Sequence, residues 1–350
     1  MDTESRDDRL AQLQAGIAVQ AELLTASEGW QDWLRTAARF YNYSPNNVML
    51  IMMQAPEATL VKGFQAWQEM GRHVNKGESA IWILAPITRK LAVDERGNAR
   101  PLRRGEMPHG GEMVQHQLVG SKAVAVFDVS QTSGDPLPGW DARHPQLLQG
   151  KATPGLWDAL AQQVHQAGFE LHRADCSPAN GTTDYISRVV TIQPGFTEAM
   201  AVKTLAHELA HVKMHDSDTG KKGLIDCRGI KEVEAESVAY LVLADAGMDS
   251  ASYTVKYVTG WTEDVAGKSP AEVVKSTAER VLKTARQIIG TNDELMPAPI
   301  EPGVEQALQS RPGVIATQQL GTPATTAAPA PSQEPPHPVQ PIQPGQQLSM

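Results

Sequence analysis

The chain has 350 residues and a formal net charge of −9; 41% of its residues are hydrophobic and 20% are charged. This length is enough for two domains and a tail, and the negative charge argues against a polycation that wraps nucleic acid along its whole length. Cys176 and Cys227 are too few for a disulfide framework. The N-terminus is charged and no apolar run approaches the roughly 18 residues of a membrane span, so we expect a cytoplasmic protein without a membrane segment.

Helical and strand patterns alternate in the first 130 residues. The predicted elements are, in order, helices at residues 5–26, 27–40 and 48–53, a short helix at 63–70, and strands at 79–87 and 123–129. The stretch 91–113 is rich in Gly and Arg and is interpreted as a long hairpin or a mobile loop. A turn and linker follow residue 129, and the domain boundary is expected near residues 140–152.

The second half of the chain is predicted to be mostly helical, with two short strands. It begins with a helix at 154–168, a strand at 169–173, a hairpin turn at Asn180–Gly181 and a strand at 185–192. Helices are then expected from Thr197, which can cap its first turn, across 230–246 up to Gly247, and at 270–289. Beyond residue 295 the chain is rich in Pro, Gln, Ala and Thr, which predicts a disordered or polyproline-like tail at 296–350.

The helix that Thr197 caps carries the motif His207-Glu208-Leu-Ala-His211, an H-E-x-x-H. Residues four apart on a helix lie roughly 40° apart around its axis and ~6 Å apart along it, so both imidazoles can reach one zinc ion. Glu208 lies between them and can take a proton from a metal-bound water and pass it to a leaving amine. A strand followed by a turn precedes the helix, and the edge of such a strand can pair with a peptide substrate.

A catalytic zinc needs a third protein ligand, and the helix at 230–246 offers acidic candidates. Glu232 and Glu236 share one face of that helix, whereas Glu234 does not. We assign Glu232 as the metal ligand and Glu236 as the acceptor for the second N–H of a ligating histidine. The reverse assignment remains open.

His215 extends the histidine series by another four residues. It lies ~12 Å along the helix from His207, too far to share the same ion. We therefore interpret His215 as a residue at the helix end, near the negative end of the helix dipole, rather than as a ligand.

A local excess of positive charge marks residues 62–104. Nine cations face four acids there, namely Lys62, Arg72, Lys76, Arg89, Lys90, Arg96, Arg100, Arg103 and Arg104 against Glu69, Glu78, Asp94 and Glu95. Such an asymmetry within an acidic chain suggests an anionic partner for this segment. A solvated hairpin is the alternative.

Two groups of motifs resemble known families. The H-E-x-x-H together with Glu232-Val-Glu-Ala-Glu-Ser-Val-Ala239 resembles the ImmA/IrrE-type metallopeptidases, in which the first of these glutamates is the third zinc ligand. The N-terminal part resembles the single-stranded-DNA-binding domain of ArdC-type antirestriction proteins. The residues that carry this second resemblance are 43–50 (YSPNNVML), 63–67 (GFQAW), 71–78 (GRHVNKGE) and 126–132 (VFDVSQT).

The second resemblance implies single-stranded DNA as a partner, which requires cations for phosphates and flat side chains for bases. The candidate DNA-binding residues are Tyr41, Tyr43, Asn47, Lys62, Trp67, Arg72, Lys76, Trp82, Arg89 and Lys90. Core packing is the alternative for Trp67 and Trp82, and it is the interpretation we favour for Trp33, Phe64 and Phe127.

The sequence therefore predicts an α+β protein with a DNA-binding domain at 1–145, a gluzincin-like metallopeptidase domain at 152–292 and the tail at 296–350. The expected cofactor is Zn²⁺, with Mn²⁺ as the alternative, and the expected substrate is a protein or peptide. The resemblance implies a role in protecting incoming mobile-element DNA from restriction. Two alternatives stay open: a single-stranded-DNA-coating protein with a structural or inactive metal domain, and a DNA-stimulated protease acting on DNA-bound proteins.

Overall fold

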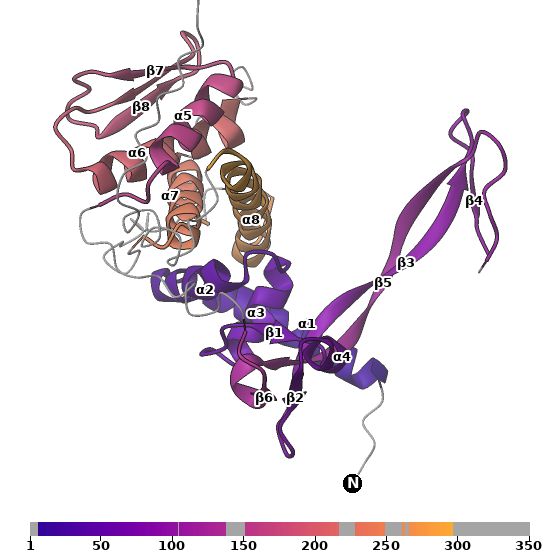
Figure 1. The fold of residues 1–350 in the computed structure, drawn as a ribbon. Coiled ribbons are helices and arrows are strands. Elements are labelled where there is room, and N and C mark those ends of the chain that lie inside the picture. Colours follow the sequence, from indigo (N-terminus) through magenta and orange to yellow (C-terminus); the bar gives the residue numbers. More distant parts are fainter. Residues whose placement is uncertain are drawn as a thin grey trace, which may run out of the picture. The chain divides into compact units, whose positions relative to one another are not determined.

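The computed structural model describes residues 6–103, 105–137, 151–216, 228–248, 261–262, 265 and 267–296. The described residues all belong to one compact unit. The predictions for Cys227, for the boundary near 140–152 and for the tail fall wholly or almost wholly outside the described residues. We call residues 6–137 the N-terminal region and residues 151–296 the C-terminal region; both are drawn in Figure 1.

Three helices open the N-terminal region, as predicted: α1 (Arg6–Leu23), α2 (Ser27–Phe40) and α3 (Pro45–Gln54). The last begins where Ser44 accepts a hydrogen bond from the backbone N–H of Asn47 and Pro45 presets the first helical residue. Their apolar faces bury Trp30 and Trp33 completely, together with the run Val48–Ile51 of α3. The loss of this much apolar surface from water holds the three helices together.

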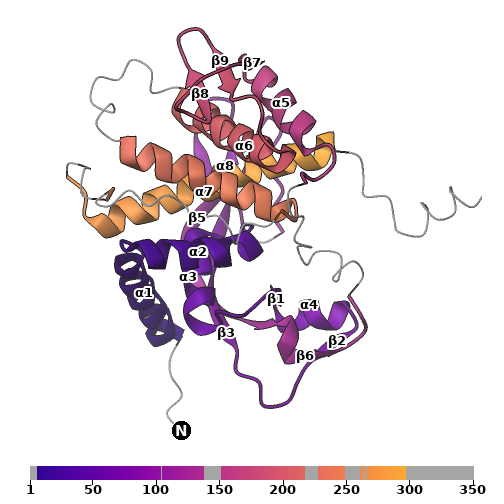
Figure 2. The same cartoon turned by 90° about the vertical axis from the view of Figure 1, so that its left-hand side faces the viewer.

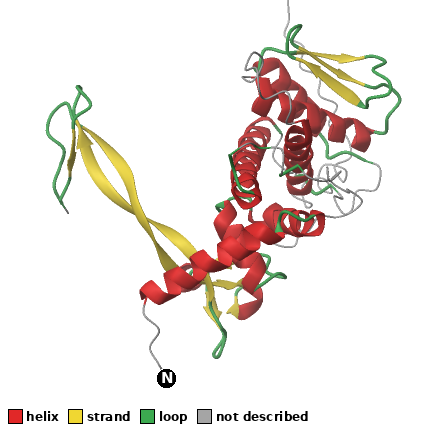
Figure 3. Ribbon diagram, turned by 180° about the vertical axis from the view of Figure 1, so that it is seen from behind, coloured by secondary structure: helices red, strands yellow, loops and turns green. Residues whose placement is uncertain are grey.

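A four-stranded antiparallel sheet in the order β1-β5-β3-β4 follows. Its strands are β1 (Val61–Lys62), β3 (Ile81–Val93), β4 (Ala99–Pro101) and β5 (Met113–Asp128). Strands β3 and β5 pair over their whole length, with a register shift between Ile87 and Thr88. The two strands form a long ribbon (Figure 3) and are much longer than predicted, because residues 87–90 of β3 and 113–120 of β5 are exposed and lack the alternating pattern that signals a strand. Of the two options for residues 91–113, the hairpin is confirmed.

The rest of the N-terminal region braces one end of the ribbon. It consists of α4 (Phe64–Glu69), the paired strands β2 (Arg72–Val74) and β6 (Thr132–Gly134), and a single 3-10 turn, η1 (Val129–Gln131). Asp128 ends β5 and ties the segments together, because its carboxylate accepts hydrogen bonds from the backbone N–H groups of Thr59, Leu60 and Ser130.

The C-terminal region begins with α5 (Leu156–Gln166) and a three-stranded sheet in the order β7-β9-β8. Strand β7 (Glu170–Arg173) runs parallel to β9 (Val189–Ile192), and β8 (Gly181–Asp184) pairs antiparallel with β9. The predicted hairpin turn at Asn180–Gly181 is wrong. Gly181 opens β8, and the turn lies at 185–188, where Arg188 adopts a φ of 55°.

Three long helices complete the region: α6 (Glu198–His215), α7 (Arg228–Asp245) and α8 (Pro270–Leu295). Thr197 caps α6 through a bond from the N–H of Met200, and Gly247 ends α7 with a φ of 71°, both as predicted. Helix α7 packs against α6 on one side and α8 on the other (Figure 2). Among the described residues, the structure contains no helix long and apolar enough to cross a bilayer.

The two regions meet through α7 and α8. The indole N–H of Trp30 on α2 donates to the hydroxyl of Ser237 on α7, 3.0 Å away. The guanidinium of Arg286 on α8 donates to the backbone carbonyls of Tyr41 and Tyr43, just beyond the C-terminus of α2. Helix α7 therefore belongs to the packing of both regions.

Candidate metal centre

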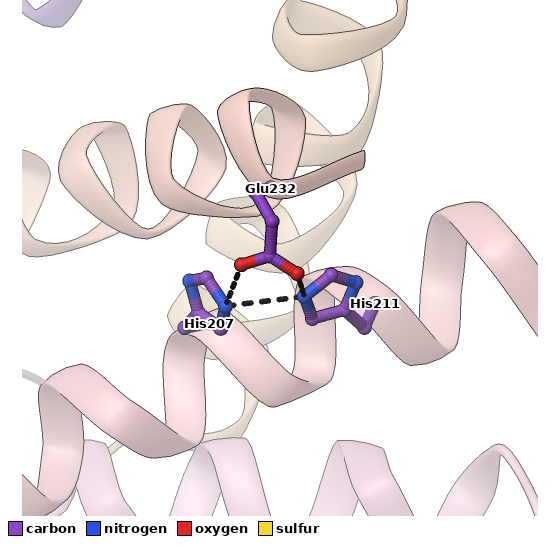
Figure 4. Close-up of side chains that lie close together, drawn as sticks. All are labelled: His207, His211 and Glu232. Atoms are coloured by element: carbon purple, nitrogen blue, oxygen red, sulfur yellow. Dashed lines mark hydrogen bonds and ion pairs between the residues drawn. The ribbon is translucent and has the colours of Figure 1, made fainter. Parts of the chain in front are cut away.

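The site is built on α6 and α7, where they cross. His207 and His211 lie one turn apart on α6, and Glu232 lies in the second turn of α7. The carboxylate of Glu232 reaches between the two imidazoles, with one oxygen 3.5 Å from Nε2 of His207 and the other 3.5 Å from Nε2 of His211 (Figure 4). The two Nε2 atoms are 3.1 Å apart. The structure thus brings together the three side chains that the sequence predicts as ligands.

These separations suit a divalent metal ion. Donor atoms on a tetrahedral zinc at 2.0–2.1 Å lie about 3.3 Å from one another, close to the separations observed here. One atom from each of His207, His211 and Glu232 can be chosen so that all lie within 4.8 Å of one another. Two imidazole nitrogens and one carboxylate oxygen are also a donor set that zinc accepts, with a fourth position left for water.

Glu208 lies beside the ligands, buried against β8. It is only 5% exposed, and Oγ1 of Thr183 on β8 donates to its Oε2 at 2.7 Å. Gly181 at the start of β8 leaves room for it, because a Cβ at that position would lie 2.8 Å from Oε1 of Glu208 and 2.7 Å from Cγ2 of Thr204. Strand β8 therefore both holds the Glu208 carboxylate and sets the space available to it.

Glu236 supports His207 from the opposite side of its ring. Its Oε2 lies 3.0 Å from Nδ1 of His207, and its Oε1 forms an ion pair with Nζ of Lys203 at 3.1 Å. Burial alone would lower the pKa of His207, but the bonds to Glu232 and Glu236 outweigh burial and raise the pKa to about 9. The contacts of its carboxylate with the imidazoles of His207 and His211 hold the pKa of Glu232 far below its usual range.

The sequence interpretation missed the role of a third carboxylate on α7. Glu234 is 1% exposed, and its Oε2 lies 3.0 Å from Nε2 of His215, which is itself 3% exposed. Nδ1 of His215 lies 3.0 Å from Nδ1 of His211, and Arg280 on α8 forms an ion pair with Glu234. His215 ends α6, as predicted. The only hint of its contact with Glu234 in the sequence was that α7 carries acids at 232, 234 and 236. Which of them meets His215 depends on how α6, α7 and α8 cross.

Four of the predicted DNA-binding side chains make hydrogen bonds within the protein, and two of the four are buried. Trp67 is 0% exposed and donates its indole N–H to the carbonyl of Phe127, so it offers no face to a base. Asn47 is buried and bonds to both the N–H and the carbonyl of Leu84 on β3. Tyr43 donates to the carbonyl of Val61, and Arg72 bonds to the side chain and the carbonyl of Thr132. We correct the assignments of Trp67 and Asn47, whereas those of Tyr43 and Arg72, which are half-buried, stay predictions.

The other candidates remain accessible to different degrees. Lys76, Arg89 and Lys90 are exposed, whereas Lys62 and Trp82 are half-buried, and Arg9 lies over the Trp82 ring at 4.7 Å. Burial and the neighbouring Asp245 raise the pKa of the half-buried Tyr41 to about 12. Phe64 is 49% exposed, so core packing was the wrong interpretation for it. The sequence pattern around Phe64 did not indicate that this side chain would be exposed.

Comparison with known proteins finds similarity to a family in the N-terminal region. Residues 7–127 match the family model described as the N-terminal domain of anti-restriction factor ArdC. An uncharacterized protein of Bacillus anthracis is 28% identical over 249 residues, which is 65% of this chain and 42% of that protein. The alignment thus spans less than half of that relative.

Among solved structures, the metal-free antirestriction ArdC protein of plasmid R388 covers 80% of this chain and 99% of its own, with a TM-score of 0.48 and 18% identity. The Mn(II)-bound structure of that protein covers 75% of this chain and 99% of its own, with a TM-score of 0.40 and 17% identity.

Proposed function

We propose that this chain, whose residues 7–127 match the family model of the N-terminal domain of anti-restriction factor ArdC, is an antirestriction-type protein with two activities. The N-terminal region binds single-stranded DNA, and the site on α6 and α7 is a divalent-metal peptidase centre. The observation that carries the second activity is the carboxylate of Glu232 set between Nε2 of His207 and Nε2 of His211, with Glu208 adjacent on the same helix.

In this proposal His207, His211 and Glu232 hold the ion. A Zn²⁺ ion, or Mn²⁺ in its place, would supply a Lewis acid that lowers the pKa of a water molecule towards 7. The carboxylate of Glu208 would accept a proton from the water that attacks the carbonyl carbon, and it would deliver this proton to the amine that leaves as the C–N bond breaks. Thr183 keeps the carboxylate in place by its hydrogen bond to Oε2.

Strand β8 is the proposed guide for the peptide. It is an edge strand of its three-stranded sheet, and it contacts α6 next to Glu208. An extended substrate can add to such an edge through main-chain hydrogen bonds, which hold a peptide regardless of its side chains. The substrate would then lie across the helix that carries both histidines.

The proposed DNA contacts are the exposed cations of the N-terminal region. Arg89 and Lys90 lie on the exposed part of β3, and Lys76 lies in the loop that follows β2. Trp82, which is half-buried, and Phe64, which is exposed, are two aromatic side chains of this region that remain accessible. Cations for phosphates and rings for bases give binding with little sequence preference.

The experiment that tests this function compares the wild type with Glu208→Gln, which keeps the size of the side chain but removes its basic carboxylate. Glu198→Gln in the exposed first turn of α6 is the matched control. Each protein is assayed for protection of an incoming unmodified plasmid, for single-stranded-DNA affinity and for metal content. The proposal expects Glu208→Gln alone to lose protection while it keeps its DNA affinity and its metal.

A second candidate function is coating of single-stranded DNA with an inactive metal site. It is favoured by the family match, which ends at residue 127, well before His207. Full protection by Glu208→Gln would select this candidate.

A third candidate is a protease that DNA stimulates. It is favoured by the bond between Trp30 and Ser237, since α7 packs on the N-terminal region and also carries Glu232. Hydrolysis of a generic unfolded protein, measured with and without a single-stranded oligonucleotide, separates this candidate from a constitutive peptidase.

A further inference from the structure

A buried row of side chains leads from His211 into the protein, away from Glu232. Nδ1 of His211 lies 3.0 Å from Nδ1 of His215, and Nε2 of His215 lies 3.0 Å from Oε2 of Glu234. His215 and Glu234 are almost fully buried, at 3% and 1% exposure. Arg280 of α8 then pairs with the other oxygen of Glu234. Three helices thus contribute to a single row that ends at a predicted metal ligand.

The direction of each hydrogen bond in this row follows from the chemistry of its last member. An ionised carboxylate only accepts, so Nε2 of His215 must carry the hydrogen that it shares with Glu234. A neutral imidazole has one donor and one acceptor nitrogen, which leaves Nδ1 of His215 as an acceptor. Nδ1 of His211 must therefore donate, and Nε2 of His211 is left with a lone pair that faces Nε2 of His207, 3.1 Å away.

We propose that His215 and Glu234 are positioning residues that lock His211 in the Nδ1–H tautomer and so direct its Nε2 lone pair at the metal position. The inference rests on the metal-binding part of the proposed function and not on peptide hydrolysis. Histidine ligands are commonly oriented by a carboxylate on their second nitrogen. Here the carboxylate acts on His211 through an intervening imidazole.

The arrangement around His207 supports this assignment. Its Nδ1 bonds directly to Glu236, whose other oxygen pairs with Lys203. Each predicted histidine ligand therefore has its Nδ1 held by a carboxylate that a cation balances. The carboxylate is Glu236 with Lys203 for His207, and Glu234 with Arg280 through His215 for His211. A carboxylate paired with a cation thus stands behind each histidine, although the residues differ. If His215 only filled space in the core, it would not need such a pair.

Both nitrogens of His215 are occupied in this row, so it is not a fourth ligand. Its removal would leave His211 free to rotate or to adopt the other tautomer. Loss of such an outer partner typically weakens metal binding about 10- to 100-fold.

The first experiment reads the tautomers directly in the wild-type chain. Long-range ¹H–¹⁵N correlation spectra of the metal-free and zinc-loaded protein distinguish a protonated Nδ1 from a protonated Nε2. We expect His211 as the Nδ1–H form and His215 as the Nε2–H form in both samples. The opposite tautomer of His211 would overturn the inference, even if the protein binds zinc. Failure to take up zinc with these tautomers in place would instead refute the proposed metal centre and leave the positioning row intact.

The second experiment uses a matched pair of variants, His215→Phe and His215→Gln. The Phe variant keeps a ring but removes both polar contacts, whereas the Gln amide retains an acceptor for His211 and a donor for Glu234. We expect the zinc dissociation constant, measured by chelator competition, to rise about 10- to 100-fold with Phe and to recover largely with Gln. The visible spectrum of the cobalt-loaded protein should change with Phe and not with Gln. Equal affinities and equal spectra for both variants and the wild type would overturn the inference.

Discussion

The indole of Trp30 and the hydroxyl of Ser237 form a 3.0 Å hydrogen bond between two side chains that are both 0% exposed. Ser237 follows directly on Glu236, which supports His207, so this bond ties α2 to the same helix that supplies the acids of the metal centre. The metal site and the N-terminal region therefore share helix α7. A substitution of Trp30 should affect the packing of both.

The bond between Trp30 and Ser237 can be tested by stability. Trp30→Phe leaves the buried Ser237 hydroxyl without its donor, which costs about 1–3 kcal/mol. Trp33→Phe is the control, since within the described part of the chain Nε1 of Trp33 is buried without a partner. Both substitutions remove a similar volume. Urea unfolding should show Trp30→Phe to be less stable than Trp33→Phe by about that amount, and equal stability would mean that the bond contributes nothing.

The space beside Glu208 gives a second prediction. Gly181→Ala would place a Cβ 2.7 Å from Thr204 and 2.8 Å from Glu208, so one of the three must shift, at a cost of about 1–3 kcal/mol. Gly120→Ala on β5 is the control, because nothing lies within 4 Å of a Cβ there. The free energy of unfolding should fall only for Gly181→Ala. A neutral Gly181→Ala would show that β8 does not confine the Glu208 side chain.

Metal uptake should release a proton at neutral pH. His207 has a pKa of about 9 in the metal-free protein and must lose its proton to bind a metal. Calorimetric titrations at pH 7 in buffers of different ionisation enthalpy should therefore give about one proton released per ion. The affinity should rise as the pH rises towards 9 and level off above it. A release of zero protons would show that His207 is already neutral.

The same raised pKa affects the stability of the metal-free protein. A folded-state pKa above the usual 6.5 contributes stability that is complete below pH 6.5 and is lost as the pH rises through 9. The free energy of unfolding should therefore decline between these pH values in the wild type, and the decline should be smaller in His207→Gln.

The proposed DNA surface predicts a change in salt dependence. Lys90→Ser removes one exposed cation from β3, whereas Lys283→Ser removes one from α8, outside the N-terminal region. For single strands, each phosphate contact contributes about 0.7 to the slope of log affinity against log salt. Fluorescence anisotropy with a labelled oligonucleotide should show a slope smaller by about 0.7 for Lys90→Ser and an unchanged slope for Lys283→Ser. The reverse result would place the DNA surface elsewhere.

The helices of the metal centre could be predicted because their signals are local. The four-residue spacing of His207 and His211, the cap at Thr197 and the stop at Gly247 all lie within one element and its flanks. The partnership of His215 with Glu234 depends on how α6 and α7 cross and on Arg280 from a third helix. No spacing in the sequence encodes that crossing.

The failures in the N-terminal region have a similar cause. Trp67 is chemically suited to stacking on a base, but its N–H finds the carbonyl of Phe127 across 60 residues of chain, which makes it a core residue. The distal half of the β3–β5 ribbon has exposed residues on both strands, so it lacks the buried face that produces an alternating pattern. Tertiary pairing, rather than local pattern, decides both cases.

The most direct test of the metal centre is the zinc content of the purified protein after zinc is offered, measured by mass spectrometry for the wild type, Glu232→Ala and Glu236→Ala. We expect one ion per chain in the wild type, loss of the ion in Glu232→Ala, and weaker but retained binding in Glu236→Ala, because Glu232 touches both histidines at the metal position and Glu236 touches only the far side of His207. Loss of the ion in Glu236→Ala with retention in Glu232→Ala, or a wild type that takes up no zinc, would contradict the account.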